Sequence, residues 1–514
     1  MTVGEYNKAY LKAFPDAESF SDEKVARLKD SVDMSFIYPS AKPFNYQMPA
    51  IYALTRFNSV LLSDRPGLGK TFEVITAYSH IYAKTQSKML VICPASLLFQ
   101  WKSQIELFSR FYAEVVDSKK LAKFGKIFNE TDIVLMSYQT ADKLNSKVSL
   151  NTYKFGTVVL DEAEAVKSPE TNFFHSCRDI TRGIQRKFLL TGTPSTGKLE
   201  DSFCYVDILS SGTIPYALLK QQFCILKEKK IRIYPKNGRP AYDIKLNLIH
   251  SYKDVERFKE IFSSYLFGRN PEDIGADLPD KNIIYHDIDK PEYLKRFQSI
   301  ALDGKFINSD GTEKKLNSIQ IISTLHRGNH SIQMLYPEAT VPNARIAELK
   351  SIIESYPADK QIAVFFNYKT VPAELDSYFT DNGGYVMISG DVASKARSNN
   401  LQAFKNGEAR FCLFTMAGYA GIDLCNCDVL ILYDLIYSKS KFDQILGRVT
   451  RVSSPFDSVD IHIIRYTQSL DMAISELLES RQKIRDVLEL SEESSADFLL
   501  KSVKKATINV YGYK

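Results

Sequence analysis

Short apolar runs alternate with amphipathic stretches through the first 200 residues of the chain. Two amphipathic helices are predicted between these runs, at residues 71–82 and 97–108. The runs are rich in aliphatic and β-branched residues and predict buried strands at residues 60–62, 89–93, 133–136 and 157–160. Strands that alternate with helices in this way predict a parallel sheet covered by helices on both faces.

The same alternation restarts after residue 345. The second set of predicted strands lies at residues 361–366, 385–388, 409–415, 429–433 and 459–464. Residues 215–345, between the two sets, are charged and irregular and include a basic, turn-rich stretch at 227–240. We therefore predict an α/β fold with two tandem parallel-sheet domains and a helical or irregular insertion between them.

These patterns divide the chain into five predicted segments, which fits the domain count expected for 514 residues. A peripheral helical segment comes first, and a first sheet domain, a linker or insertion region, a second sheet domain and a tail follow. A closing amphipathic helix is expected from residue 471 to about residue 490. The predicted boundaries are residues 1–40, 41–265, 266–344, 345–490 and 491–514.

Composition adds only weak constraints. The formal net charge of +5 is compatible with a nucleic-acid partner but does not require one. The seven cysteines form no CxxC pair and the seven histidines are dispersed, so we expect reduced thiols and no metal site built from protein ligands alone. The chain shows neither a signal-peptide pattern nor an apolar run of the ~18 residues that span a bilayer, which predicts a soluble, intracellular protein without a membrane partner.

A candidate phosphate-binding loop with the sequence DRPGLGKT follows the first predicted strand and opens the first predicted helix. Lys70 would reach the β- and γ-phosphates of ATP, and the Thr71 hydroxyl would bind Mg²⁺. Asp64 occupies the position of the usual first glycine, so a chance glycine-rich turn is the alternative. The loop residues predicted to contact ATP are Pro66, Gly67, Leu68, Gly69, Lys70 and Thr71.

Two adjacent carboxylates, Asp161 and Glu162, end the fourth predicted strand. Asp161 would bind Mg²⁺, and Glu162 would polarise the attacking water. Paired carboxylates are also common on solvated turns. The pair follows the phosphate loop by about the length expected within one domain, which favours a hydrolytic site.

Two arginines, Arg448 and Arg451, lie three residues apart on one face of a predicted helix in the second sheet domain. Arginines that stabilise the transferring phosphoryl group contribute roughly 10³–10⁵ in rate. Surface arginines on a helix are the alternative. In the catalytic interpretation both arginines reach ATP only when the two domains close, which makes ATP binding a conformational event.

Taken in order, these segments resemble the SWI/SNF-type branch of superfamily 2 helicases, over about residues 41–490. The resemblance is carried by FNYQ (44–47), DRPGLGKT (64–71), VICPASLLFQW (91–101), SY (137–138), DEAE (161–164), LTGTP (190–194), AGYAGIDL (417–424) and QILGRVTR (444–451). Residues 222–224 and 278–281 are similar to features found between the lobes of this branch. The pattern looks closest to annealing helicases and fork remodellers.

The resemblance implies two RecA-like lobes of the P-loop type that bind ATP and Mg²⁺. It implies that Tyr46 and Gln47 lie in the adenine-reading segment. It also implies that Gly421, Asp423 and Gln444 of the second lobe contribute to the ATP site. Contacts to nucleic-acid phosphates would come from the ends of strands, although a turn or cap role suits each of these residues equally well. These candidates are Ser96, Ser137, Thr193, Asn367 and Thr415.

Three positions depart from the pattern of the family. Glu164, at a position that couples ATP to nucleic acid, stands where the family usually has histidine. Asp423 replaces the asparagine of many members, although related helicases often carry aspartate there. Residues 267–269, Phe-Gly-Arg, replace a double arginine before the linker.

Three functions remain open at this point. The first is an ATP-dependent translocase on double-stranded DNA that acts on branched or protein-bound DNA in replication, recombination or repair. The second is a strand-separating helicase on DNA or RNA. The third is an ATPase that remodels a polymerase or another protein complex with DNA as its track. In each case residues 227–239 are a candidate DNA contact, with a solvated loop as the alternative.

The resemblance also sets expectations about context. We expect a monomer that binds double-stranded or branched DNA, with a possible protein partner from the recombination or transcription machinery. The chain shows no recognisable chromatin-reading, zinc or nuclease module. This minimal build looks like a bacterial or viral member, in the cytoplasm of a bacterium or a virus-infected cell, or in the nucleus of a eukaryote.

Overall fold

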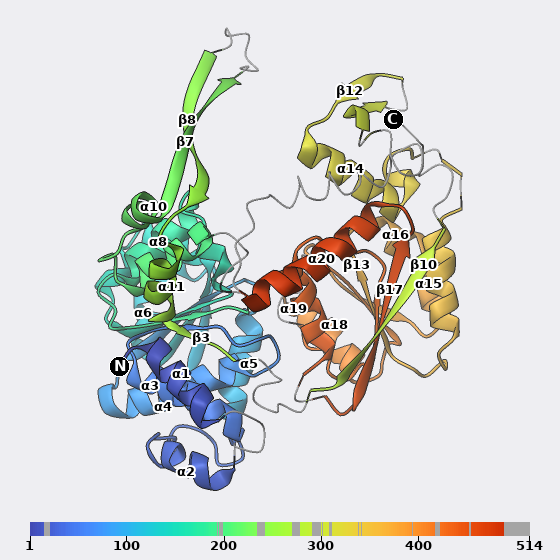
Figure 1. The fold of residues 1–514 in the computed structure, drawn as a ribbon. Helices are drawn as coiled ribbons and strands as arrows, with labels where there is room; N and C mark the ends of the chain where they lie inside the picture. Colours follow the sequence, from blue (N-terminus) through green and yellow to red (C-terminus); the bar gives the residue numbers. More distant parts are fainter. Residues whose placement is uncertain are drawn as a thin grey trace. The chain divides into compact units, whose positions relative to one another are not determined.

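The chain forms two compact units, residues 1–276 and residues 277–514, and each contains one large parallel sheet (Figure 1). The computed structural model describes residues 1–14, 21–192, 194, 199–233, 242–269, 278–289, 300, 302–307, 311–337, 339–340, 342–392, 394–416, 422–451 and 454–487. The predicted α/β class with two parallel sheets is confirmed.

The first unit is built on a seven-stranded sheet in which all neighbouring strands are parallel. Its four predicted strands are confirmed as β1, β2, β4 and β5, and their near-continuous burial is typical of a parallel sheet covered on both faces. In spatial order the strands are β3 (Ala113–Val116), β4 (Ile133–Ser137), β2 (Lys88–Cys93), β5 (Phe155–Asp161), β6 (Arg186–Leu190), β1 (Ser59–Leu62) and β9 (Leu266–Phe267).

Helices connect these strands, and the two helices predicted from periodicity are confirmed as α4 and α5. The α-helices of this unit are α1 (Val3–Ala13), α2 (Asp22–Asp30), α3 (Met48–Arg56), α4 (Lys70–Thr85), α5 (Leu98–Phe108), α6 (Phe124–Glu130), α7 (Tyr138–Asn145), α8 (Asn172–Thr181), α9 (Phe203–Leu209), α10 (Tyr216–Phe223) and α11 (Val255–Ser263). Short 3-10 helices add η2 (Asn45–Gln47), η3 (Leu121–Lys123), η4 (Leu150–Thr152), η5 (Ala163–Val166) and η6 (Leu199–Ser202).

Helix α1 packs against the last strand of the same unit, although its sequence predicted a peripheral segment. The backbone N–H of Val3 donates to the Ser264 carbonyl at 3.2 Å. The side chain of Tyr10 is buried, and its ring centroid lies 5.7 Å from that of Phe267 in β9. The start of the chain therefore covers the outer side of β9.

A two-stranded antiparallel hairpin, β7 (Cys224–Ile233) and β8 (Tyr242–Tyr252), pairs with no other described strand. It projects from the first unit as a long ribbon (green in Figure 1). The prediction of irregular structure for this charged stretch is therefore wrong. The alternation of Ile244, Leu246 and Leu248 with polar residues is the signal that could have identified β8. The turn of the predicted basic stretch, residues 234–240, lies outside the described residues.

The second unit contains a six-stranded sheet, also parallel throughout. The five predicted strands of this unit are all present. These five are β13 to β17, and β10 is a sixth strand that was not predicted. In spatial order the six strands of the sheet are β10 (Asp280–Ile288), β17 (Ser458–Tyr466), β16 (Val429–Leu432), β13 (Ile362–Phe366), β15 (Phe411–Thr415) and β14 (Tyr385–Ile388). The region predicted as a linker thus supplies β9 to the first sheet and β10 to the second. A small hairpin of β11 (Lys305–Ile307) and β12 (Glu313–Lys315) lies outside both sheets.

Alternate residues of β13 enter two separate cores on the two faces of the second sheet. Ile362, Val364 and Phe366 pack with α15, α16 and α17, while Ala363 and Phe365 share the other core with α14, α19 and α20. Among the described residues, no helix has both the length and the apolar character needed to cross a membrane. The helices of this unit are α14 (Ser318–His330), η7 (Ile332–Met334), α15 (Ala344–Glu354), α16 (Thr370–Glu374), α17 (Asp376–Asp381), α18 (Ser394–Lys405), α19 (Lys439–Val449) and α20 (Leu470–Val487).

A pair of histidines on β10 and β17 makes the stability of the second unit sensitive to pH. His462 Nδ1 lies 2.8 Å from His286 Nε2, and His462 Nε2 lies 2.7 Å from the Tyr356 hydroxyl. Burial and the neighbouring His286 lower the pKa of His462 from 6.5 to about 4. Because the folded state then binds fewer protons than the unfolded chain, stability is lost as the pH falls from 6.5 towards 4.

Replacing His462 by glutamine is expected to weaken this loss, because glutamine does not titrate. Urea unfolding at pH 7, 5.5 and 4.5 measures the free energy of unfolding, which should fall less steeply in the variant than in the wild type. His175 is exposed on α8, so His175→Gln serves as the control and should keep the wild-type slope. Equal slopes for His462→Gln and the wild type would contradict the assignment.

Candidate active site

The candidate catalytic segments of the first unit leave three neighbouring strands at the same edge of the sheet. The phosphate loop follows β1, Thr191 follows β6, and the acidic pair lies at the end of β5, where Asp161 is the last residue; β6 lies between the other two strands. Because the strands are parallel, their carboxyl ends meet at one edge, where open α/β sheets bind ligands.

The phosphate loop takes a shape that only glycine adopts without strain at two positions. Gly67 and Gly69 have φ values of 96° and 86°, and Gly69 is the N-cap of α4. A Cβ atom at position 69 would lie 2.5 Å from Gln47 Nε2. The Lys70 ammonium donates to the Asp64 carbonyl oxygen at 2.6 Å and to the Arg65 carbonyl oxygen at 3.4 Å. The loop therefore presents the start of a helix and a lysine, as phosphate binding requires.

The predicted adenine-reading segment is held directly against this loop. Gln47 is buried, and its amide Nε2 donates to the Leu68 carbonyl oxygen at 3.1 Å. The Tyr46 hydroxyl donates to the same oxygen at 3.3 Å. The backbone N–H of Phe44 donates to Gln47 Oε1 at 3.0 Å. The segment and the loop thus form one unit, and the adenine role of Gln47 remains a prediction.

Asp161 is fixed by groups from two other strand–helix connections. The Trp101 indole N–H donates to Asp161 Oδ2 at 2.8 Å, and the backbone N–H of Glu162 donates to Oδ1 at 2.9 Å. The Tyr138 hydroxyl donates to the Asp161 carbonyl oxygen at 2.9 Å. Burial raises the pKa of Asp161, although the Trp101 hydrogen bond and the Lys70 charge oppose this. The role of Trp101 was not predicted, although it is the chain's single tryptophan.

Glu162 lies in the left-handed region of the backbone, with φ 49° and ψ 58°, directly before η5. This conformation costs a non-glycine residue about 1–3 kcal/mol and is common at active sites. Two residues later, Glu164 accepts a hydrogen bond from the Thr191 hydroxyl. The backbone N–H of Thr191 donates to the Leu62 carbonyl at 3.1 Å. Glu164 therefore connects the acidic segment to the residues beside the phosphate loop, and Thr193 lies outside the described residues.

A buried ion cluster lies behind the phosphate loop. The Arg269 guanidinium pairs with Asp64 of the loop and, at 2.6 Å, with Glu73 Oε1 of α4, and all three side chains are 0% exposed. Burial raises the pKa of Glu73 to about 8, against the lowering effect of Arg269. Sequence reasoning missed this cluster because its members are far apart in the chain.

Arg448 lies in the last turn of α19, whereas Arg451 lies beyond the end of that helix at Val449, so the two arginines do not share one helix face as predicted. Arg448 Nη1 and Arg451 Nη2 both donate to the Ile422 carbonyl oxygen, at 3.5 Å and 3.0 Å. Asp423 Oδ1 lies 3.4 Å from Arg451 Nε, and Asp423 Oδ2 lies 2.6 Å from Lys405 Nζ. Burial alone would raise the pKa of Asp423, but the charges of Arg451 and Lys405 outweigh it and hold the pKa below its ordinary value.

These contacts bring Asp423, Arg448 and Arg451 together within the second unit, and their role in ATP hydrolysis remains a prediction. Gln444 lies on the same helix, one turn before Arg448, and is buried. Gly421 lies outside the described residues.

The candidate nucleic-acid residues follow the carboxyl ends of strands within each unit. In the first unit, Ser96 is half-buried, and the Ser137 hydroxyl caps α7 by accepting from the Thr140 N–H at 3.1 Å. In the second unit, Asn367 Nδ2 donates to the Leu435 carbonyl oxygen at 3.1 Å, and Thr415 is buried at the end of β15. Ser137 and Asn367 thus have structural roles, and the nucleic-acid contacts remain predictions.

The residues present fit Mg²⁺ that arrives with ATP. Thr71 and Asp161 offer oxygen ligands, which Mg²⁺ prefers, and protein sites commonly supply one or two such ligands while the phosphates supply others. Among the described residues, no group of three or more His, Cys, Asp or Glu side chains could hold a metal ion alone.

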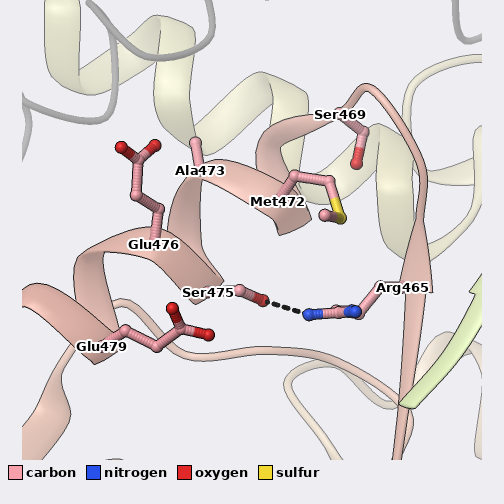
Figure 2. A pocket seen from close by; sticks show the side chains of 7 residues that line it. All are labelled: Arg465, Ser469, Met472, Ala473, Ser475, Glu476 and Glu479. Atoms are coloured by element: carbon pink, nitrogen blue, oxygen red, sulfur yellow. Dashed lines mark hydrogen bonds between the residues drawn. The ribbon is translucent and has the colours of Figure 1, made fainter.

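A cavity of about 270 Å³ lies between the end of β17 and α20 in the second unit (Figure 2). Arg465 reaches into it from β17 and donates to the Ser475 hydroxyl at 3.3 Å. Its other lining residues are Ser469, Met472, Ala473, Glu476 and Glu479. No residue predicted for the ATP or nucleic-acid site lines this cavity.

Two protein-family models match most of this chain. The SNF2-related domain matches residues 28–333, and the helicase conserved C-terminal domain matches residues 344–453. The uncharacterized ATP-dependent helicase YqhH of Bacillus subtilis is 21% identical, over 83% of this chain and 75% of the relative. The ATP-dependent DNA helicase DDM1 of Arabidopsis thaliana is 23% identical, over 83% of this chain and 59% of that protein.

Among solved structures, the Sulfolobus solfataricus SWI2/SNF2 ATPase core in complex with dsDNA is 22% identical, with a TM-score of 0.41, over 88% of this chain and 94% of that chain. The match to the SNF2-related domain covers more than half of the chain. The chain therefore belongs to the SNF2-related family, in the SWI/SNF-type branch of the superfamily 2 helicase ATPases.

Proposed function

We propose that this protein is an ATP-dependent translocase on double-stranded DNA that remodels branched or protein-bound DNA in replication, recombination or repair. The observation that carries the proposal is the edge of the first sheet of this SNF2-related ATPase, where Lys70 follows β1 and Asp161 and Glu162 lie at the end of β5, with only β6 between the two strands. The DNA helicase named among the relatives supports DNA as the track.

Hydrolysis would follow from the residues at this edge. The phosphate loop and Lys70 would bind the ATP phosphates, and Thr71 and Asp161 would hold Mg²⁺, which when bound supplies positive charge against the phosphate oxygens. Glu162 orients a water molecule and accepts its proton as the water oxygen bonds to the γ-phosphorus. The bond between the γ-phosphorus and the bridging oxygen breaks, which leaves ADP and inorganic phosphate.

The second unit would complete the site when the protein closes on ATP. Arg448 and Arg451 would then donate to the transferring phosphoryl group, and Gln444 and Asp423 would support them. Closure on ATP and reopening after hydrolysis would move the two units along one DNA strand. Glu164, through Thr191, would relay this change towards residues that contact DNA phosphates.

A panel of nucleic acids in an ATPase assay tests the proposal. Forked, Holliday-type, gapped and linear duplex DNA are expected to stimulate hydrolysis more strongly than single-stranded DNA or RNA. A preference for single strands or RNA would overturn the translocase assignment and favour a strand-separating helicase. Because backbone contacts dominate such binding, the stimulation should be largely independent of sequence and should weaken with salt.

The hairpin β7–β8 is expected to add phosphate contacts to this track. Lys227 and Lys230 are exposed on β7. Replacing both by alanine should weaken duplex binding at low salt and reduce the slope of log K against log salt by about 0.9 for each lysine that contacts a phosphate. Fluorescence anisotropy across a salt series measures both quantities.

Lys8 and Lys12 are exposed on α1, so the variant with both replaced by alanine is the control. Equal slopes for the two variants would mean that the hairpin lysines face solvent and contact no phosphate.

A further inference from the structure

Arg269 is the last described residue of the first unit before the chain continues towards β10. It follows β9 directly, and its buried side chain reaches three segments that are remote in sequence. The guanidinium pairs with Asp64 in the phosphate loop and with Glu73 on α4, and it donates to the Tyr46 carbonyl oxygen in the adenine-reading segment. One side chain therefore joins the phosphate loop, the helix that follows it and the adenine-reading segment.

Asp64 connects this arginine to the lysine of the phosphate loop. Its carboxylate Oδ1 accepts from the Arg269 backbone N–H at 3.0 Å and from Arg269 Nε at 3.2 Å. Its carbonyl oxygen accepts from the Lys70 ammonium at 2.6 Å. A phosphate that draws Lys70 away breaks the hydrogen bond to the Asp64 carbonyl oxygen. Because the Asp64 carboxylate accepts from both the backbone and the side chain of Arg269, this change reaches Arg269.

The approach of residues 267–269 to the loop is also close along the backbone. The Ser63 N–H donates to the Phe267 carbonyl at 2.7 Å, and a Cβ atom at Gly268 would lie 3.2 Å from the Ser63 carbonyl oxygen. Asn7 of α1 donates to the Gly268 carbonyl at 3.5 Å. Residues 267–268 are thus bonded both to Ser63, directly before the phosphate loop, and to α1.

An arginine suits this place better than a lysine. The planar guanidinium offers donors in a fixed fork and stays charged when buried, whereas an ammonium is a single point of charge. Removing one member of a fully buried ion cluster leaves the charges of the other members unpaired in the interior. The contacts of Arg269 therefore depend on its shape as well as on its charge.

We propose that Arg269 is a positioning residue of the ATP site that ties the phosphate loop to the connection between the two units. The inference rests on the proposed function, because it needs ATP at this loop. Binding of nucleotide tightens the Asp64–Arg269 contact and so stabilises residues 267–269. By linkage, a change that loosens residues 267–269 weakens nucleotide binding by the same factor.

The first test measures binding of a non-hydrolysable ATP analogue with Mg²⁺ by titration calorimetry on the full chain. Arg269→Lys keeps the charge but loses the fork, and its Kd is expected to rise at least about tenfold. Arg345 of the second unit provides a matched control, because it is also buried between two carboxylates, Asp434 and Asp471. Arg345→Lys should lose comparable thermal stability with an unchanged Kd. A Kd for Arg269→Lys within twofold of the wild type would overturn the inference.

A second measurement uses the wild-type chain and so does not depend on a variant that folds. Hydrogen exchange of the Arg269 amide, which donates to Asp64, should slow when the analogue binds. Unchanged exchange in a chain that binds the analogue would refute the link while leaving the ATPase assignment intact. A wild-type chain that binds no analogue would instead refute the proposed function.

Discussion

Replacing Glu162 by glutamine is expected to lower ATP turnover by roughly 10²–10⁴-fold, because glutamine cannot accept the proton of the attacking water. Glutamine has nearly the same shape, and the left-handed backbone at this position should be kept. Binding of ATP and of duplex DNA should therefore stay within about twofold of the wild type. Phosphate release gives the turnover, and fluorescence anisotropy gives the DNA affinity.

Lys70→Ala is the companion variant, since it removes the phosphate contact rather than the base. It should also abolish hydrolysis, but with weaker ATP binding and with DNA binding largely intact. The two variants together separate phosphate binding from water activation. Appreciable turnover in Glu162→Gln would remove Glu162 from the role of the base.

The second large effect is expected at Arg448. Arg448→Ala should reduce kcat by roughly 10³–10⁵ if its guanidinium stabilises the transferring phosphoryl group. Arg451→Ala should show a loss of the same kind, and the double variant should lose less than the product of the two, because residues that act on one group are not additive. The rate of hydrolysis is measured in single-turnover experiments in which ATP and duplex DNA saturate the enzyme.

Arg327 is exposed on α14 and serves as the control for this series. Arg327→Ala should keep the wild-type kcat. Thermal unfolding of each variant excludes loss of the fold as the cause, which matters because Arg448 is buried. A folded Arg448→Ala protein with wild-type kcat would remove the motor interpretation that couples hydrolysis to closure.

Much of the fold could be predicted because the strands of both sheets are covered on both faces. A run such as residues 89–93 is buried along its whole length, so its aliphatic residues mark a strand directly. The two-residue strand β9 and the exposed strand β10 gave no such signal, because one is too short and the other carries polar residues on an outer edge. Their places in the sheets depend on pairing with strands that are distant in sequence.

The candidate site divides in the same way. Lys70 and Asp161 could be found because each belongs to a short local pattern with a recognisable place after a strand. Trp101 and Arg269 could not be assigned roles, because their partners come from elsewhere in the chain. Arg269 and Asp64 are 205 positions apart, and only the folded sheet brings them together.

The order of strands in the first sheet has a consequence for synthesis on the ribosome. β1 lies between β6 and β9, so one side of β1 and the docking surface of α1 stay open until β9 has been made. At roughly 5–20 residues per second, that interval lasts on the order of 10–40 seconds, during which an exposed strand edge is available to other chains. A recombinant first unit that ends before residue 266 lacks β9, would carry the same open edge permanently and should be produced as insoluble protein.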